Sequence, residues 1–173
     1  MYDFVGKKVL VTGSTRGIGR RIAEDYIARG AEVLITGTNG DMLKQVKTEL
    51  GHKCHFVICD LSISNSSKIL FEYCSESFGT IDILVNNAGI TRDGLFLRMS
   101  QEDWDAVLNV NLNSMMQVTQ KAIKGMIKNR FGRIINISSI VGITGNIGQS
   151  NYAAAKAAMI GFTKSIAMEV ATR

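Results

Sequence analysis

A tyrosine and a lysine four positions apart, Tyr152 and Lys156, have the types and spacing to carry chemistry in this chain. The alanine-rich segment around them favours a helix, so their Cβ atoms should lie roughly 5–6 Å apart on one face. A neighbouring ammonium favours the ionised form of a phenol and makes it a usable acid–base group. Ser139, upstream of the pair, could hold a carbonyl oxygen together with the tyrosine hydroxyl. The three residues therefore predict proton transfer at a carbonyl group.

The N-terminal segment combines an aliphatic run, residues 8–11, with a glycine-rich turn and a helix-like stretch. The turn contains Gly13, Gly17 and Gly19. Glycine permits positive φ and close backbone approach, and the N–H groups of a helix N-terminus can bind a pyrophosphate. The G-x-x-x-G-x-G spacing differs from the commoner G-x-G-x-x-G, and a purely structural turn is the alternative. The residues with acid–base chemistry downstream favour the nucleotide-binding interpretation.

Several motifs follow one another in an order that resembles the short-chain dehydrogenase/reductase family. They are residues 12–19, residues 86–89, Asn111, Ser139 and the Tyr152/Lys156 pair. Within this family, residues 86–93, 132–135 and 148–156 are most similar to bacterial 3-oxoacyl-[acyl-carrier-protein] reductases. The resemblance implies NADPH-dependent reduction of 3-oxoacyl-[acyl-carrier-protein] to 3-hydroxyacyl-[acyl-carrier-protein] in the elongation steps of fatty acid biosynthesis.

The same resemblance implies roles for individual residues. Tyr152 would donate a proton to the developing alkoxide, and Ser139 would orient the carbonyl. Lys156 would assist Tyr152 and hold the nicotinamide ribose, while Asn111 would bend its helix and hold a water that replenishes the proton. Asp60 and the Leu61 backbone would meet the adenine. The residues implied in cofactor binding are Gly13, Ser14, Thr15, Arg16, Gly17, Ile18, Gly19, Thr38, Asp60, Leu61, Asn87, Ala88, Gly89, Tyr152 and Lys156.

The end of the second expected strand bears on which dinucleotide is bound. Sites that prefer NAD usually place a carboxylate there, on the ribose 2′-hydroxyl. Residues 36–39 contain no carboxylate, and Arg16 supplies a cation of the kind that pairs well with phosphate. We therefore expect Arg16 and Thr38 to flank a 2′-phosphate, which favours NADPH. The alternative is that Arg16 only caps local carbonyl groups.

The chain alternates between strand-like and helix-like segments without a linker or repeat. We expect strands at 8–11, 32–36, 55–59, 81–85 and 133–138, and helices near 17–29, 40–50, 64–78, 100–129 and 151–169. Within 100–129 we expect a short turn before one long helix. This alternation predicts an α/β fold with a Rossmann-like, doubly wound parallel sheet covered on both faces, and one NAD(P)-binding domain over residues 1–173. Family members normally continue with further strands and a substrate lid, so the resemblance implies that the C-terminal part is missing.

The composition is that of a globular enzyme domain, with 46% hydrophobic and 20% charged residues. No apolar run approaches the roughly 20 residues of a membrane span, so we expect no membrane partner. Three cysteines without framework spacing suit the reducing cytoplasm. The net charge of +5 comes without a dense basic run, which argues against nucleic acid.

A basic cluster near the end of the long expected helix is compatible with an acidic partner. By resemblance, Arg130 and Arg173 would flank the pocket mouth and receive the acyl carrier protein. Basic residues are also what a helix C-terminus prefers electrostatically, which is the alternative explanation.

Four residues between positions 52 and 59 could be mistaken for a metal site. His52, Cys54, His55 and Cys59 have a spacing that matches no familiar zinc pattern. Alternating side chains of one strand cannot all converge on one ion. We expect Cys59 to pack in the core and His52 to lie in a solvated loop, with no metal bound.

The resemblance also implies a homotetramer in which the long helix and the catalytic helix pack against symmetry mates. These helices carry more apolar positions than one narrow core-facing stripe needs. The positions are Val107, Val110, Met115, Val118, Ala122, Met126, Met159, Phe162 and Ile166.

Two alternative functions remain open on the sequence. The first is another short-chain alcohol dehydrogenase that reduces acetoacetyl-CoA, a sugar or a steroid, because these enzymes share the same four catalytic residues. The second is a non-catalytic cofactor-binding protein. The presence of Tyr152 together with Lys156 argues against the second alternative.

Overall fold

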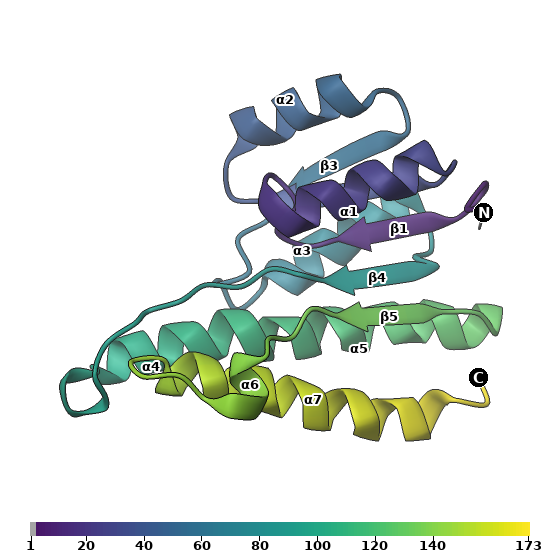
Figure 1. Ribbon diagram of the computed structural model, residues 1–173. Coiled ribbons are helices and arrows are strands. Elements are labelled where there is room, and N and C mark those ends of the chain that lie inside the picture. Colours follow the sequence, from purple (N-terminus) through teal and green to yellow (C-terminus); the bar gives the residue numbers. More distant parts are fainter. Residues whose placement is uncertain (1–2) are drawn as a thin grey trace.

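The computed structural model describes residues 3–173, whose five strands form one sheet (Figure 1). The strands are β1 (Lys8–Val11), β2 (Glu32–Gly37), β3 (Cys54–Ile58), β4 (Ile83–Asn86) and β5 (Arg133–Asn136). Their order is β3-β2-β1-β4-β5, and every neighbouring pair is parallel. The order reverses between β1 and β4, so the predicted Rossmann-like, doubly wound parallel sheet is confirmed.

Helices cover both faces of this sheet (Figure 1). One face carries α1 (Gly17–Ala28) and α2 (Gly40–Leu50), and the other carries α3 (Ser66–Tyr73), α5 (Ser114–Asn129) and α7 (Ser150–Val170). The shorter helical segments are η1 (Cys74–Phe78), η2 (Phe96–Arg98), α4 (Gln101–Leu108), η3 (Asn109–Asn113) and α6 (Val141–Thr144). None of the helices in residues 3–173 is both long and apolar enough to span a membrane.

The core divides into two layers because side chains of a strand alternate between its faces. Leu10, Leu34 and Leu84 pack with the helices α3 and α5. Their neighbours on the same strands, such as Val9, Val33 and Ile83, pack with α1 and α2. Both faces of the central strands are therefore apolar, which is why these strands read as continuous runs of aliphatic residues.

Cysteines 54 and 59 lie in different layers of this core. Cys54 packs with the α1/α2 layer and Cys59 with the α3/α5 layer. Burial raises the pKa of each thiol to about 11. The sheet separates the two sulfur atoms, as the strand alternation predicted.

The region between residues 101 and 129 is helical throughout, so the predicted short turn before the long helix is wrong. Its middle part, η3, is a π-helical segment that joins α4 to α5. π-helical segments insert one extra residue into a helix and change which residues share a face. The sequence alone also did not predict α6, which is only four residues long.

Most of the apolar positions from which the sequence predicts assembly are buried in the core of the chain. Val107, Val110, Met115, Val118, Ala122, Met126 and Met159 are all buried in the isolated chain. That part of the sequence argument for an interface is wrong, because these residues belong to the core. Exposed apolar side chains on α5 and α7 are Met116, Ile127 and Met168.

The carboxyl ends of the central strands meet at one edge of the sheet. Val11 of β1 pairs with Val85 of β4, and Val85 pairs with Ile135 of β5. The segments that follow these three strands therefore begin side by side. They carry the glycine turn, residues 86–89 and Ser139, which the sequence predicts at the carboxyl ends of the strands.

Candidate functional site

The glycine turn after β1 lies directly against the segment that follows β4. Gly13 and Gly17 have φ values of +62° and +57°, which other residues rarely adopt. A Cβ atom added to Gly13 would lie 2.8 Å from the Cα atom of Ala88. Two of the predicted glycines are thus required by backbone conformation, and one also by close approach.

Hydrogen bonds from Asn87 and Thr12 fix this contact. The Asn87 side-chain amide donates to the Thr12 and Gly13 carbonyls at 3.0 and 2.9 Å. The Thr12 hydroxyl accepts the backbone N–H groups of Asn87 and Ala88, both at 3.0 Å. The side chain of Asn87 therefore shapes the turn, while residues 87–89 present their backbone to the edge of the site.

The N-terminus of α1 opens at the end of the glycine turn. Arg16 is its N-cap residue and makes no side-chain capping bond. The first N–H groups of a helix have no partner within the helix, and their dipoles favour an anion. The segment from Gly17 to Gly19 thus offers the donors expected for a pyrophosphate.

The end of β2 lies beside the same turn. A Cβ atom added to Gly37 would lie 2.8 Å from the Thr15 side chain. This contact places the segment that contains Arg16 beside the segment that contains Thr38. Both residues are exposed. Asn39 is committed to α2, because its side chain accepts the Met42 N–H at 3.0 Å.

Asp60 and Leu61 follow β3. The Asp60 carboxylate accepts the backbone N–H and the hydroxyl of Ser62, at 2.9 and 2.7 Å. Leu61 is buried in the α3/α5 layer, so only its backbone can face a ligand. Both placements leave room for the predicted adenine contacts, with the Asp60 carboxylate already held in one orientation.

Tyr152 and Lys156 lie in the first turns of α7, as predicted. The Lys156 Nζ atom is 5.6 Å from the centre of the Tyr152 ring and donates to the Ile137 carbonyl at 2.7 Å. Lys156 is only 4% exposed, and this burial lowers its pKa. The ammonium is therefore desolvated beside the phenol, where its electrostatic effect is stronger than in water.

Three residues from different segments converge next to this lysine. A Cβ atom added to Gly89 would lie 3.1 Å from Asn111 Oδ1 and 3.9 Å from Lys156 Nζ. Asn111 is fully buried in η3, and its side chain binds both backbone groups of Ile90, at 2.8 and 2.9 Å. The π-helical segment and this pair of hydrogen bonds account for a polar residue in an apolar helix. A side chain at position 89 would therefore crowd Asn111, so glycine suits this close approach.

Ser139 reaches the site on the segment between β5 and α6. Its hydroxyl accepts the Val141 N–H at 3.2 Å. The preceding residue, Ser138, donates to the Lys156 carbonyl at 3.1 Å. Ser139 is thereby held against the face of α7 that carries Lys156, and the structure brings all four predicted catalytic residues to one edge of the sheet.

The model of the short-chain dehydrogenase family matches residues 7–173. This chain belongs to that family. It is an oxidoreductase that acts on alcohol or ketone groups, and the family's cofactor is a nicotinamide dinucleotide.

Several relatives are similar over nearly the whole chain. The 3-oxoacyl-[acyl-carrier-protein] reductase of Aquifex aeolicus is 55% identical over 97% of this chain and 69% of its own length. Nodulation protein G of Rhizobium sp. strain N33 is 49% identical over 100% of this chain and 71% of its own. A solved structure described as a putative gluconate dehydrogenase from Agrobacterium tumefaciens has a TM-score of 0.92 at 34% identity, over 96% of this chain and 67% of that one. The chain is therefore a short-chain dehydrogenase that is similar in sequence to named 3-oxoacyl-[acyl-carrier-protein] reductases and to nodulation protein G.

Sequence reasoning missed two residues that shape this dehydrogenase site. A Cβ atom added to Gly142 would lie 2.7 Å from the Lys156 carbonyl carbon, so α6 can touch α7 only through glycine. Asn151 is fully buried beside Tyr152. No residue spacing in the sequence indicates either residue. The one available signal for Asn151 was its position as a polar residue directly before a predicted catalytic tyrosine.

The two arginines predicted at the pocket mouth lie at the other end of the dehydrogenase. Arg130 follows α5 and precedes β5, whereas Ser139 follows the carboxyl end of β5. Arg173 follows the C-terminus of α7, whereas Tyr152 lies near its N-terminus. At a rise of 1.5 Å per helical residue, Arg173 is about 30 Å from Tyr152. The expectation that both flank the mouth of their own chain's site is wrong, because α5 and α7 carry them away from it.

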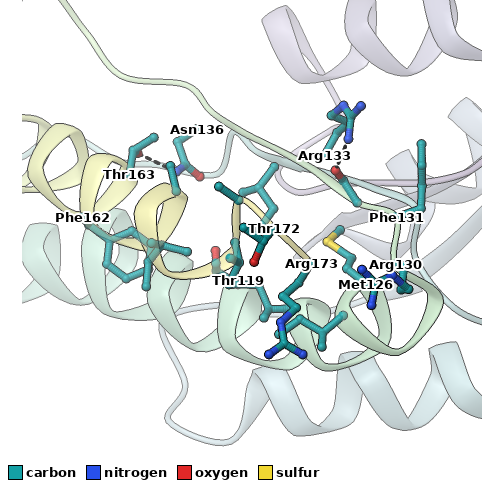
Figure 2. A pocket seen from close by; sticks show the side chains of 18 residues that line it. Thr119, Met126, Arg130, Phe131, Arg133, Asn136, Phe162, Thr163, Thr172 and Arg173 are labelled. Carbon is teal, nitrogen blue, oxygen red and sulfur yellow. Dashed lines mark hydrogen bonds between the residues drawn. The ribbon is translucent and has the colours of Figure 1, made fainter.

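Arg130 and Arg173 instead line a cavity of about 480 Å³ between β5, the end of α5 and the second half of α7 (Figure 2). Its wall includes Phe162 and Ile166 of α7 and Ile134 of β5. Side chains on β5, the edge strand, alternate between exposed and half-buried. The arginines thus share one cavity, whose lining does not include Ser139, Tyr152 or Lys156.

Proposed function

We propose that this protein catalyses the NADPH-dependent reduction of 3-oxoacyl-[acyl-carrier-protein] to 3-hydroxyacyl-[acyl-carrier-protein] in fatty acid biosynthesis. The observation that carries the proposal is the convergence of Gly89, Asn111 and Lys156 at one place in the fold. Tyr152 stands on the same helix as Lys156. Similarity of 47–55% to named 3-oxoacyl-[acyl-carrier-protein] reductases supports the substrate class.

The bound nicotinamide supplies the hydride. In our proposal, Tyr152 donates its phenolic proton to the carbonyl oxygen as negative charge develops there, and the Ser139 hydroxyl hydrogen-bonds to the same oxygen. The Lys156 ammonium stabilises the phenolate that remains and binds the ribose. Asn111 holds a water that returns the proton. The protein thus contributes position and electrostatics, in a site that backbone contacts and buried hydrogen bonds organise.

The glycine turn and the end of β2 would bind the other half of the cofactor. Residues 13–19 would hold the pyrophosphate, and residues 60–61 and 87–89 the adenosine. Arg16 and Thr38 are exposed on adjoining segments without a carboxylate between them, which suits a 2′-phosphate. This arrangement supports NADPH over NADH.

The decisive experiment follows NADPH oxidation by the purified chain with a 3-oxoacyl thioester, with a sugar and a steroid ketone as competing substrates. We expect turnover with the thioester, and a loss of about 10²–10⁴-fold in Tyr152→Phe with NADPH affinity nearly unchanged. Turnover with only the sugar or the steroid ketone would favour the alternative function as another short-chain alcohol dehydrogenase. Cofactor binding without any turnover would favour the non-catalytic alternative.

The carrier protein and the oligomer are linked in this proposal. Arg173 lies about 30 Å along α7 from Tyr152. Arg130 lines the same cavity as Arg173, so we propose that both arginines serve the site of a neighbouring subunit. A homotetramer that packs α5 and α7 against symmetry mates would provide such a neighbour. Exposed Met116, Ile127 and Met168 on these helices support a covered surface.

We further propose that residues 1–173 act as a single cofactor-binding unit in the cytoplasm. The predicted site residues all lie in the loops and helices that belong to one parallel sheet. The three cysteines, Cys54, Cys59 and Cys74, are unpaired and buried, which suits a reducing compartment.

A further inference from the structure

The N-terminus of α7 has an unusual cap. Its N-cap residue, Gln149, makes no side-chain capping bond. The N–H of Tyr152 is among the first four of the helix, which have no partner within the helix. The side-chain oxygen of Asn151 accepts this N–H at 2.7 Å. The residue beside the predicted catalytic tyrosine therefore supplies the missing cap from inside the helix.

The other half of the Asn151 amide binds two segments that are distant in sequence. Its Nδ2 atom donates to the Arg92 carbonyl at 3.0 Å and to the Asp103 carbonyl at 3.4 Å. Arg92 belongs to the loop that follows β4, and Asp103 lies in the first turn of α4. Asn151 has no exposed surface, so water cannot replace these bonds.

This loop is also bound by Asn111, whose side chain lies next to Gly89. Ile90, two residues before Arg92, is held on both backbone groups by Asn111. The same loop is also bound to the segment before α7, because the Gly94 N–H donates to the Gly148 carbonyl at 2.8 Å. A chain of contacts thus runs from Asn111 through the loop to Asn151 and Tyr152. Asn151 is its buried junction.

We propose that Asn151 is a positioning residue, which fixes Tyr152 relative to the loop after β4 and hence to Asn111 and Lys156. The inference rests on the proposed catalytic role of Tyr152. Asn151 does not touch the reacting atoms, and its effect on turnover passes through the placement of the phenol. Displacing a catalytic group by about 1 Å can lower a rate by roughly 10²-fold.

The test uses Asn151→Asp, which keeps the shape and the acceptor but turns the donor into an oxygen that faces two carbonyl groups. Asn151→Ser is a milder second variant, and Asn113→Asp applies the same change to an exposed amide. We expect kcat to fall about 10–100-fold in the Asn151 variants, with KM and NADPH affinity within about threefold. Asn113→Asp should stay within about twofold of the parent.

Two further measurements separate positioning from a general loss of structure. In a Tyr152→Phe background, the Asn151 variants should lower the residual turnover by less than threefold, because residues that act through each other are not additive. Amide hydrogen exchange should speed up in residues 90–99 and 149–153 and stay unchanged in β1 and α1.

An equal loss of turnover in the parent and Tyr152→Phe backgrounds would overturn the proposal, as would unchanged exchange in both segments. Full turnover in Tyr152→Phe would instead refute the proposed function. The exchange experiment needs no turnover, so it would still decide whether Asn151 holds these segments together.

Discussion

A methyl group added at Gly142 tests whether the contact between α6 and α7 sets the position of Ser139. In Gly142→Ala the new Cβ atom would lie 2.7 Å from the Lys156 carbonyl carbon and 2.9 Å from the Ala157 nitrogen. These are backbone atoms of a long helix and cannot rotate away. The short helix α6 must move instead, and Ser139 lies just before it.

The size of the movement follows from the contact distance. Ordinary van der Waals contact begins at 3.4 Å, so α6 must shift by roughly 0.7 Å. Since a 1 Å misplacement can cost about 10²-fold in rate, a shift of this size predicts a fall in kcat of roughly 10–50-fold. Overpacking costs about 1–3 kcal/mol, while alanine gains up to about 1 kcal/mol over glycine in a helix. The expected net loss in the free energy of unfolding is therefore only about 0–2 kcal/mol.

The assay combines steady-state reduction of a 3-oxoacyl thioester, NADPH titration and urea unfolding. Gly161→Ala in the middle of α7 is the matched control, because its Cβ atom would meet nothing within 4 Å. It should stabilise the chain by about 0.5–1 kcal/mol and leave kcat unchanged. If Gly142→Ala kept kcat within twofold, the contact would not position Ser139. A parallel loss of cofactor affinity would also refute the reasoning, because it would mean that Lys156 and α7 move rather than α6.

Three further predictions concern charged groups. Arg16→Ala should weaken NADPH by about 10–100-fold and NADH by much less, and equal weakening of both in a titration would exclude the 2′-phosphate contact. Because burial lowers the pKa of Lys156 below 10.5, the parent chain should gain stability relative to Lys156→Met as the pH rises toward 10.5. The melting temperature of the parent should therefore rise relative to that of Lys156→Met between pH 7 and 10.5. A constant difference over this range would count against a lowered pKa for Lys156. Charge reversal of Arg130 and Arg173 should lower kcat/KM for a carrier-linked substrate and spare a small free thioester, with the effect weakening at high salt. Parallel losses with both substrates would make these arginines structural.

Local patterns were sufficient to predict the fold class and to select site residues that the structure brings to one edge of the sheet. The alternation of aliphatic runs and helical segments predicted all five strands within two residues of their observed ends. The spacing of Tyr152 and Lys156 on one helix predicted their proximity, because the helical period is fixed by backbone geometry. The glycines at 13 and 17 were predictable because the turn needs positive φ.

Tertiary structure decided the features that depend on segments far apart in sequence. The amide of Asn151 reaches carbonyls 59 and 48 positions away, and no spacing in the sequence indicates those partners. Gly142 is required only because α6 lies against the backbone of Lys156. Arg130 and Arg173 were predicted together, but the direction of α5 and α7 across the sheet carries both to the end that is distant from Tyr152 of the same chain. The sequence therefore determined which residues have the right chemistry, because residue type and helical period are local properties. Packing alone determined where these residues are held and which neighbours hold them.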